Sequence, residues 1–266
     1  MTTFDAYERE LWAGRAEAYE QGFARLSGCT VERLLDAAGV RAGHRVLDVG
    51  TGPGPVAAAA ARRDAQVSAV DAEPEMAEAA ARNVPGADVH VAVLPELPFD
   101  DASFDAVVGN FVINHVGEPV TALEELRRVL RPGGRLALTC WTMPGSGVLA
   151  IVREAMDEVG VPWPEDVPVS PFMEYGRPEA FGELVGRVLR DVSVEELDWE
   201  FEFEPEDWWR TGAMARVGSN GVVLARQDPA TIARVKDAYD RILRPCAAGN
   251  GTVRVAAHAL LAHGVH

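Results

Sequence analysis

Cysteine and metal-binding patterns are scarce in this sequence. Only three of its 266 residues are cysteines, at Cys29, Cys140 and Cys246, and only six are histidines. The cysteines are far apart, odd in number and match no zinc-ligand spacing, and the histidines form no metal-ligand grouping. We therefore expect reduced, structural thiols and no metal site.

Positive charge is also scarce, since 25 Lys and Arg residues face 41 Asp and Glu residues and the net charge is −16. Binding to nucleic-acid phosphates requires a concentrated basic surface, and the sequence shows no basic cluster. Long apolar runs are missing as well, because no window approaches the roughly 18 apolar residues of a membrane-spanning helix. The N-terminal region lacks a basic patch followed by an apolar run. We expect a cytoplasmic protein without nucleic-acid or membrane partners.

The dinucleotide-binding fingerprint is absent too, although a glycine-rich turn is present. The stretch 46–49 is mostly apolar and predicts a short buried strand, after which Gly50, Gly52 and Gly54 let the backbone turn sharply and approach a ligand closely. In a G-x-G-x-x-G fingerprint a glycine would stand at the position of Pro55. This spacing disfavours a nicotinamide ligand, and the lack of a Walker-type G-K-[ST] disfavours a nucleoside phosphate.

Four motifs follow one another at suitable spacing. Asp48–Gly54 reads D-x-G-x-G-x-G, and Asp71–Met76 reads D-x-x-x-x-M. Leu97–Asp105 and Leu130–Leu136 look like the segments that lead into a fourth and a fifth strand. Over about Val46–Cys140 these motifs together resemble the class I S-adenosylmethionine-dependent methyltransferases, in particular the type 11 branch that acts on small molecules.

The resemblance implies an α/β fold with a doubly wound, mostly parallel sheet of seven strands, an antiparallel last strand and a helical cap. The residues agree, because strand-like runs alternate with helical segments, which is typical of a parallel sheet covered on both faces. The expected strands are Val46–Gly50, Val67–Asp71, Val89–Val93, Ala106–Asn110, Arg135–Trp141, Val192–Phe203 and Thr252–His263. The expected helices are Asp5–Leu26, Thr30–Ala38, Val56–Arg63, Pro74–Asn83, Pro119–Leu130, Gly147–Gly160, Pro178–Leu189, Glu204–Val217 and Pro229–Leu243.

The expected organisation is a single methyltransferase domain over residues 1–266. A chain of 266 residues can bury one sizeable core, and nothing in the sequence demands a second independent domain. Its expected parts are an N-terminal helical lid (1–39), a cofactor-binding core (40–141), a substrate or cap region with one sheet strand (142–251) and the last strand (252–266).

The expected cofactor site lies at one edge of the sheet, because ligands of open α/β sheets bind beyond the carboxyl ends of the strands. Asp71 ends the second strand, and its two oxygens can accept hydrogen bonds from both hydroxyls of a ribose. The resemblance implies S-adenosylmethionine as the cofactor, with Asp48 near its methionine end. Since Val93 stands where many relatives carry Asp or Asn, we expect backbone amides near Leu94 to recognise the adenine. The expected cofactor contacts are Tyr19, Asp48, Gly50, Thr51, Gly52, Gly54, Asp71, Ala72, Met76, Val93, Leu94, Pro95, Asn110 and Phe111.

The resemblance implies methyl transfer to O, N or C of a small, partly apolar molecule such as a secondary metabolite, by a monomer or homodimer. The alternative is a cofactor-binding member of the fold with a non-methylating or regulatory role. The expected acceptor contacts are Trp141, Met143, Phe172, Trp208 and Trp209. Trp208 and Trp209 alternatively anchor the cap, and Tyr19 alternatively packs the N-terminal helix onto the body. His115 follows the fourth strand, and because imidazole suits proton transfer near neutral pH we predict that it takes a proton from the acceptor. Local hydrogen bonding is the alternative role for this side chain.

Overall fold

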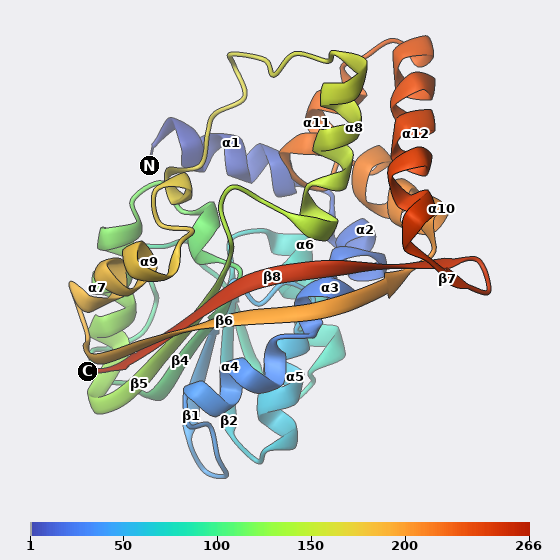
Figure 1. The fold of residues 1–266 in the computed structure, drawn as a ribbon. Coiled ribbons are helices and arrows are strands. Elements are labelled where there is room, and N and C mark those ends of the chain that lie inside the picture. The colour runs from blue at the N-terminus through green and yellow to red at the C-terminus, as the bar shows by residue number, and fades with distance from the viewer. Residues whose placement is uncertain (1) are drawn as a thin grey trace.

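The computed structural model describes residues 2–266, which fold around one mixed β-sheet (Figure 1). The strands are β1 Arg45–Val49, β2 Gln66–Asp71, β3 Asp88–Val91, β4 Phe104–Asn110, β5 Leu130–Trp141, β6 Arg190–Phe203, β7 Ala247–Gly249 and β8 Thr252–Val265. They lie in the order β3-β2-β1-β4-β5-β8-β6, and β7 pairs with β8 outside this path. Strands β1 to β5 are parallel, whereas β8 is antiparallel to both β5 and β6. The predicted α/β sheet with an antiparallel last strand is confirmed, and the short β7 is an addition that was not predicted.

Helices surround this sheet. The α-helices are α1 Thr3–Trp12, α2 Ala16–Gln21, α3 Phe23–Gly28, α4 Val31–Ala37, α5 Pro55–Arg62, α6 Pro74–Asn83, α7 Pro119–Val129, α8 Ile151–Val159, α9 Pro178–Gly186, α10 Pro205–Trp208, α11 Gly218–Ala225 and α12 Pro229–Leu243. The shorter turns are the 3₁₀ turns η1 Ile113–His115, η2 Gly147–Leu149, η3 Pro171–Met173 and η5 Arg244–Cys246 and the π-helical turn η4 Trp209–Met214.

Alternate side chains of the central strands enter two separate cores, which is why these strands read as nearly continuous apolar runs. In β1, Val46 belongs to the core formed with α4 and α5, whereas Leu47 and Val49 belong to the core formed with α7 and α9. All three side chains are buried. The sheet is covered on both faces, so the carboxyl ends of its parallel strands form the edge that is available to a ligand.

A third core joins the ends of β6 and β8 to the cap, which consists of α8, α10, α11, α12 and η4. Trp208 is central to it, because its ring lies 4.7 Å from that of Phe23, 5.3 Å from that of Phe201 and 5.2 Å from that of Phe203. In Figure 1, α8, α11 and α12 stand together above the ribbon formed by β6 and β8, with α1 beside them. These contacts hold the N-terminal helices and the cap together beyond the carboxyl edge of the sheet.

The N-terminal region differs from the prediction of one helix over 5–26, because it forms the separate helices α1, α2 and α3. Gly14, with φ +68°, stands in the turn after α1. Between α2 and α3, a Cβ on Gly22 would lie only 2.7 Å from Thr211 Oγ1, so glycine is required for this close contact with η4. The predicted helix over 204–217 is α10 followed by η4. Helix α11 was missed because its Gly-Ser-Asn-Gly start contains no strong helix former.

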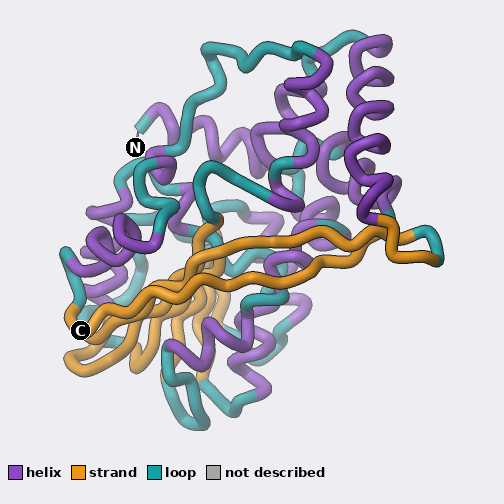
Figure 2. Tube along the Cα trace, viewed as in Figure 1, coloured by secondary structure: helices purple, strands orange, loops and turns teal. Residues whose placement is uncertain are grey.

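The segment between α8 and η3 contains no regular helix or strand (Figure 2). This agrees with the proline-rich irregular sequence that follows residue 160. Within residues 2–266, no helix is both long enough and apolar enough to cross a membrane. Cys29, Cys140 and Cys246 are free thiols.

Candidate active site

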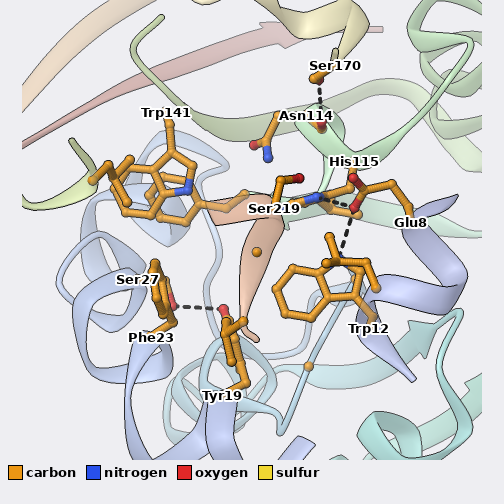
Figure 3. A pocket seen from close by; sticks show the side chains of 18 of the residues that line it. Glu8, Trp12, Tyr19, Phe23, Ser27, Asn114, His115, Trp141, Ser170 and Ser219 are labelled. Atoms are coloured by element: carbon orange, nitrogen blue, oxygen red, sulfur yellow. Dashed lines mark hydrogen bonds and ion pairs between the residues drawn. The ribbon is translucent and has the colours of Figure 1, made fainter. Parts of the chain in front are cut away.

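A cavity of about 910 Å³ lies between the carboxyl ends of the central strands, helix α1 and the cap. Figure 3 shows Trp141 and His115 on opposite sides of this cavity, with Tyr19 and Trp12 near one another. Most of the predicted site residues line it. These are Tyr19, Gly50, Gly52, Asp71, Ala72, Met76, Val93, Leu94, Asn110, Phe111, His115, Trp141, Met143 and Trp208. The structure therefore brings residues from the N-terminal helices, the ends of the central strands and the cap to one space.

Asp71 connects the end of β2 to the glycine-rich turn. Its Oδ2 accepts a hydrogen bond from Gly52 N at 2.8 Å, and its Oδ1 accepts one from Glu73 N at 2.9 Å. Burial raises the pKa of the Asp71 carboxyl group, while these backbone N–H donors counteract the rise. Each oxygen keeps accepting capacity beyond its one backbone donor, so the carboxylate is oriented and still able to accept two ligand hydroxyls.

Gly50 and Gly52 are required for different reasons. Both have positive φ, +65° and +54°, which glycine tolerates best. A Cβ on Gly50 would lie 2.6 Å from Val112 Cβ, so this position is closed by the protein itself. A Cβ on Gly52 would meet only the ring of Tyr19 at 3.5 Å, so this position borders open cavity space. Gly52 and Asp71 together fit a ribose-bearing cofactor, because they offer close backbone approach beside an oriented acceptor.

Asp48 braces the same turn from behind and does not line the cavity. It is 1% exposed, and its Oδ2 accepts hydrogen bonds from Thr51 Oγ1 at 2.7 Å and from Ala57 N at 3.0 Å. Its Oδ1 has no partner among residues 2–266. Burial raises the pKa of Asp48 to about 7. The expectation that Asp48 reaches the methionine end of the cofactor does not match this position, because the side chain points into the junction of β1 and α5.

Three further expected cofactor contacts also lie outside the cavity lining, namely Thr51, Gly54 and Pro95. Thr51 is buried and donates its hydroxyl to Asp48. Gly54, with φ +92°, is the N-cap of α5 and packs against Ala80 of α6, 3.3 Å from its would-be Cβ. At the third strand the lining is formed by Val93 and Leu94.

Asn110, at the end of β4, connects the N-terminal helices to the sheet through hydrogen bonds. Its Oδ1 accepts hydrogen bonds from Thr30 Oγ1 at 2.8 Å and Thr139 Oγ1 at 2.7 Å, and its Nδ2 donates to Ser27 O at 2.9 Å. Ser27 also lies 3.1 Å from the hydroxyl of Tyr19. The Asn110 amide is therefore occupied by the protein, and its position fixes α3 and Tyr19 over the glycine-rich turn.

An aromatic wall lines the cavity beside the ends of β4 and β5. The rings of Phe111 and Trp141 stack with a centroid distance of 3.8 Å and an interplanar angle of 15°. Phe111 has φ +59°, and its N–H donates to Thr139 Oγ1 at 3.0 Å, which holds the ring in place. Met143 and Trp208 also line the cavity. This wall suits a flat or partly apolar molecule.

Two expected acceptor contacts are placed elsewhere. Phe172 is fully buried beneath α9, with its ring 5.6 Å from that of Phe181, and does not line the cavity. Trp209 packs against Tyr239 of α12, 5.1 Å between centroids, and is likewise outside the lining. Consecutive helical residues point about 100° apart, so Trp208 borders the cavity while Trp209 faces α12. The anchoring alternative therefore describes Trp209, and Phe172 is a core residue.

His115 stands in η1 and pairs with a lid residue that the sequence did not suggest. Its Nδ1 lies 2.7 Å from Oε2 of Glu8, and Trp12 Nε1 donates to the same oxygen at 3.0 Å (Figure 3). The ring of Trp12 meets the imidazole edge-on at 5.2 Å. Glu8 is only 8% exposed although it lies on an N-terminal helix. The one available signal was that Glu8 and Trp12 are one helical turn apart and share a face.

A polar patch at the same end of the cavity was also missed. Asn114 is 5% exposed, and its Oδ1 has no hydrogen-bond partner among the residues the structure describes. Figure 3 shows its side chain directed into the cavity near Ser219. Ser170 Oγ donates to the carbonyl oxygen of Asn114 at 2.9 Å and holds this backbone. In residues 2–266 no group of three or more His, Cys, Asp or Glu side chains is arranged to hold a metal ion.

Comparison with known proteins shows which family the central part of the chain is similar to. Residues 47–138 match the family model described as a methyltransferase domain. Demethylmenaquinone methyltransferase of Clavibacter sepedonicus is 44% identical over 120 residues, which are 44% of this chain and 47% of that protein. The chain spans about half the length of the curated demethylmenaquinone methyltransferases that it matches.

Solved structures show the same fold. Phosphoethanolamine N-methyltransferase 2 of Haemonchus contortus, in complex with S-adenosylhomocysteine, has a TM-score of 0.55 at 20% identity over 89% of this chain and 52% of that one. The [4+2]-cyclase SpnF has a TM-score of 0.53 at 20% identity over 90% of this chain and 81% of that one. Together with the family match, these likenesses confirm the predicted resemblance to the class I methyltransferases over residues 47–138.

Proposed function

We propose that this protein transfers the methyl group of S-adenosylmethionine to an O, N or C atom of a small, partly apolar molecule. The observation that carries this proposal is the continuity of the cavity, which extends from Asp71 and Gly52 to Trp141 at the end of β5, to Met143 and to Trp208 of the cap. A cofactor and an acceptor can therefore meet in one cavity. Its volume of about 910 Å³ lies within the usual range for ligand sites.

The cofactor half of the site is formed by the core. The Asp71 carboxylate accepts hydrogen bonds from the ribose hydroxyls, and Gly52 allows the backbone to approach the cofactor closely. Val93, Leu94 and Met76 provide an apolar surface for the adenine. When bound, the cofactor supplies a methyl group on a positively charged sulfur that is an excellent leaving group. The ring of Tyr19 lines the cavity beside Gly52 and would favour this cation.

The protein contributes mainly by orientation and by excluding water. Helix α1 is fastened over the cavity, because Asp5 Oδ1 accepts a hydrogen bond from Gly117 N at 2.7 Å and Tyr7 donates to Ser219 Oγ at 3.1 Å. Alignment of reactants in a closed site can supply about 7–11 kcal/mol of the barrier reduction. A hydroxyl or acidic-carbon acceptor must also lose a proton, and we assign this role to His115, which borders the cavity.

The acceptor class follows from the lining. The stacked Phe111 and Trp141 favour a ring or another flat apolar group, while Asn114 and Ser219 offer polar contacts. Several relatives are named for demethylmenaquinone, and a small aromatic acceptor of a secondary pathway fits the same requirements. The net charge of −16 supports a protein without nucleic-acid partners, and we propose a cytoplasmic monomer or homodimer.

Isothermal titration with S-adenosylhomocysteine and with NAD tests the cofactor assignment, and we expect binding of the former alone. Transfer of a radiolabelled methyl group from S-adenosylmethionine to a panel of small aromatic metabolites then tests the reaction. Binding without transfer to any acceptor would favour the non-methylating alternative. This arm is needed because the [4+2]-cyclase named above has the same fold.

A further inference from the structure

Glu8 and His115 form the closest pair of titratable side chains that border the cavity, with 2.7 Å between Oε2 and Nδ1. The two residues come from opposite parts of the site, since Glu8 belongs to the lid helix α1 and His115 to the turn after β4. The proposed methyl transfer assigns a role to His115 but none to Glu8. A carboxylate at 8% exposure on a lid helix therefore needs an explanation.

The pairing fixes which nitrogen of His115 carries its proton. A carboxylate oxygen can only accept, so in the neutral imidazole Nδ1 is the donor to Glu8 and Nε2 keeps its lone pair. No protein partner for Nε2 is found among residues 2–266, whereas the residue lines the cavity and its side chain is 31% exposed. Nε2 is thus left for a bound molecule.

Trp12 holds the carboxylate in turn. Its Nε1 donates to the same Glu8 oxygen at 3.0 Å, and its ring meets both the imidazole at 5.2 Å and the ring of Tyr19 at 5.5 Å. Glu8 and Trp12 are both on α1, so the pair exists only while α1 lies over the cavity. The arrangement has the form of a base oriented by a buried acid.

We propose that Glu8 is a positioning residue that makes His115 a proton acceptor when the lid is closed, and that the acceptor is therefore a hydroxyl, of the phenol or enol class. This inference rests on the proposed methyl transfer. The acceptor oxygen gives its proton to Nε2 as it attacks the methyl carbon. One O–C bond forms, one C–S bond breaks with its electron pair on sulfur, and the imidazolium, stabilised by Glu8, later releases the proton to water.

The first experiment measures the His115 tautomer and needs no acceptor. The protein is labelled with ¹⁵N-histidine, saturated with S-adenosylhomocysteine and studied by long-range ¹H–¹⁵N correlation at a pH where the ring is neutral, and His115→Gln identifies the signals. We expect the Nδ1–H form in the wild type and in Glu8→Gln, which keeps an acceptor oxygen. In Glu8→Ala the Nε2–H form should appear.

Tyr7→Phe is the matched control, because it removes a different anchor of the same helix, the bond to Ser219, without touching His115. Its tautomer should equal that of the wild type. The same tautomer in the wild type and in Glu8→Ala would overturn the proposal. If S-adenosylhomocysteine binds to none of the proteins, the methyl-transfer proposal fails, while the tautomer of the free protein still decides the role of Glu8.

The second experiment separates positioning of a base from support of the fold. Methyl transfer is measured to 5-indanol and to 5-aminoindane, which share one ring system, but only the hydroxyl must lose its proton to attack. Glu8→Ala should lower transfer to 5-indanol by about tenfold or more and transfer to 5-aminoindane by less than about threefold. Equal losses with both probes would overturn the proposal. If the wild type methylates neither probe, the tautomer measurement decides alone.

Discussion

Replacing Asp71 by alanine tests the cofactor site directly. The side chain offers two oxygens, each already oriented by one backbone N–H, from Gly52 and Glu73. Hydrogen bonds to a charged group contribute about 1.5–3 kcal/mol, and removal of an acceptor leaves its partner unsatisfied at a cost of about 1–3 kcal/mol. Because the ribose hydroxyls of the variant complex regain some hydration, we expect binding to weaken by about 1–3 kcal/mol. This corresponds to a dissociation constant that is roughly 5- to 140-fold higher.

The assay is isothermal titration with S-adenosylhomocysteine. Glu75→Gln is the matched control, since it removes one negative charge from the first turn of α6 but faces solvent and does not line the cavity. It should bind like the wild type. Asp71→Asn keeps one acceptor oxygen and should fall between the wild type and Asp71→Ala. An unchanged dissociation constant in Asp71→Ala, with the protein still folded, would refute the ribose assignment.

Three other outcomes follow from the same geometry. Gly52→Val should abolish binding of S-adenosylhomocysteine in titration calorimetry, because the new side chain enters cavity space at a residue with φ +54°. Circular dichroism should still show a folded protein. Normal binding would exclude the glycine-rich turn as the cofactor site. Trp208→Ala should raise the acceptor KM more than Trp209→Ala does, because only Trp208 lines the cavity. Trp209→Ala should mainly lower the melting temperature, because Trp209 packs against Tyr239. A larger increase in acceptor KM in Trp209→Ala than in Trp208→Ala would contradict this placement. His115→Ala should lower kcat by about 100-fold with cofactor affinity nearly unchanged. A loss below roughly tenfold would mean that orientation of the reactants, and not proton removal by His115, accounts for the rate acceleration.

The central strands and several helices were predictable because local patterns decide them. Helix α6 has the predicted bounds Pro74–Asn83, with proline in its first turn, and α12 has the predicted bounds Pro229–Leu243. In α12 the side chain of Asp228 caps the first turn by accepting from Ala230 N and Thr231 N. Each of these signals lies within a few residues of the element that it defines.

The sheet edge that carries Gly52 and Asp71 was predictable for a related reason, but the Glu8–His115 end of the cavity was not. Gly52 and Asp71 belong to motifs that follow single strands, and parallel strands bring their carboxyl ends to one edge. The Glu8–His115 pair joins residues 107 positions apart, so no local pattern contains it. Likewise, the direction of Trp209 depends on where α12 packs, which the sequence around Trp209 does not encode.

The pH dependence of stability provides a separate test of the glycine-rich turn. Burial raises the pKa of Asp48 to about 7 from an ordinary value of 3.8, so between these values the folded state holds more protons than the unfolded state. The free energy of unfolding therefore decreases as pH rises through this window and levels off above about pH 7. Asn cannot titrate, and an Asn at position 48 resembles the protonated acid in shape and hydrogen bonding.

Asp48→Asn should consequently isolate the contribution of this one carboxyl group. From pH 8 to pH 6 the free energy of unfolding of the wild type should increase by about 1.4 kcal/mol relative to that of the variant, since one pKa unit corresponds to about that amount. For a protein of this size the gain corresponds to a rise of about 2–4 °C in the difference between the two melting temperatures. Differential scanning calorimetry at several pH values measures this difference. Melting temperatures that change in parallel over the range would show that Asp48 is already ionised in the folded state, and its unpartnered Oδ1 would then have to be satisfied by water behind the turn.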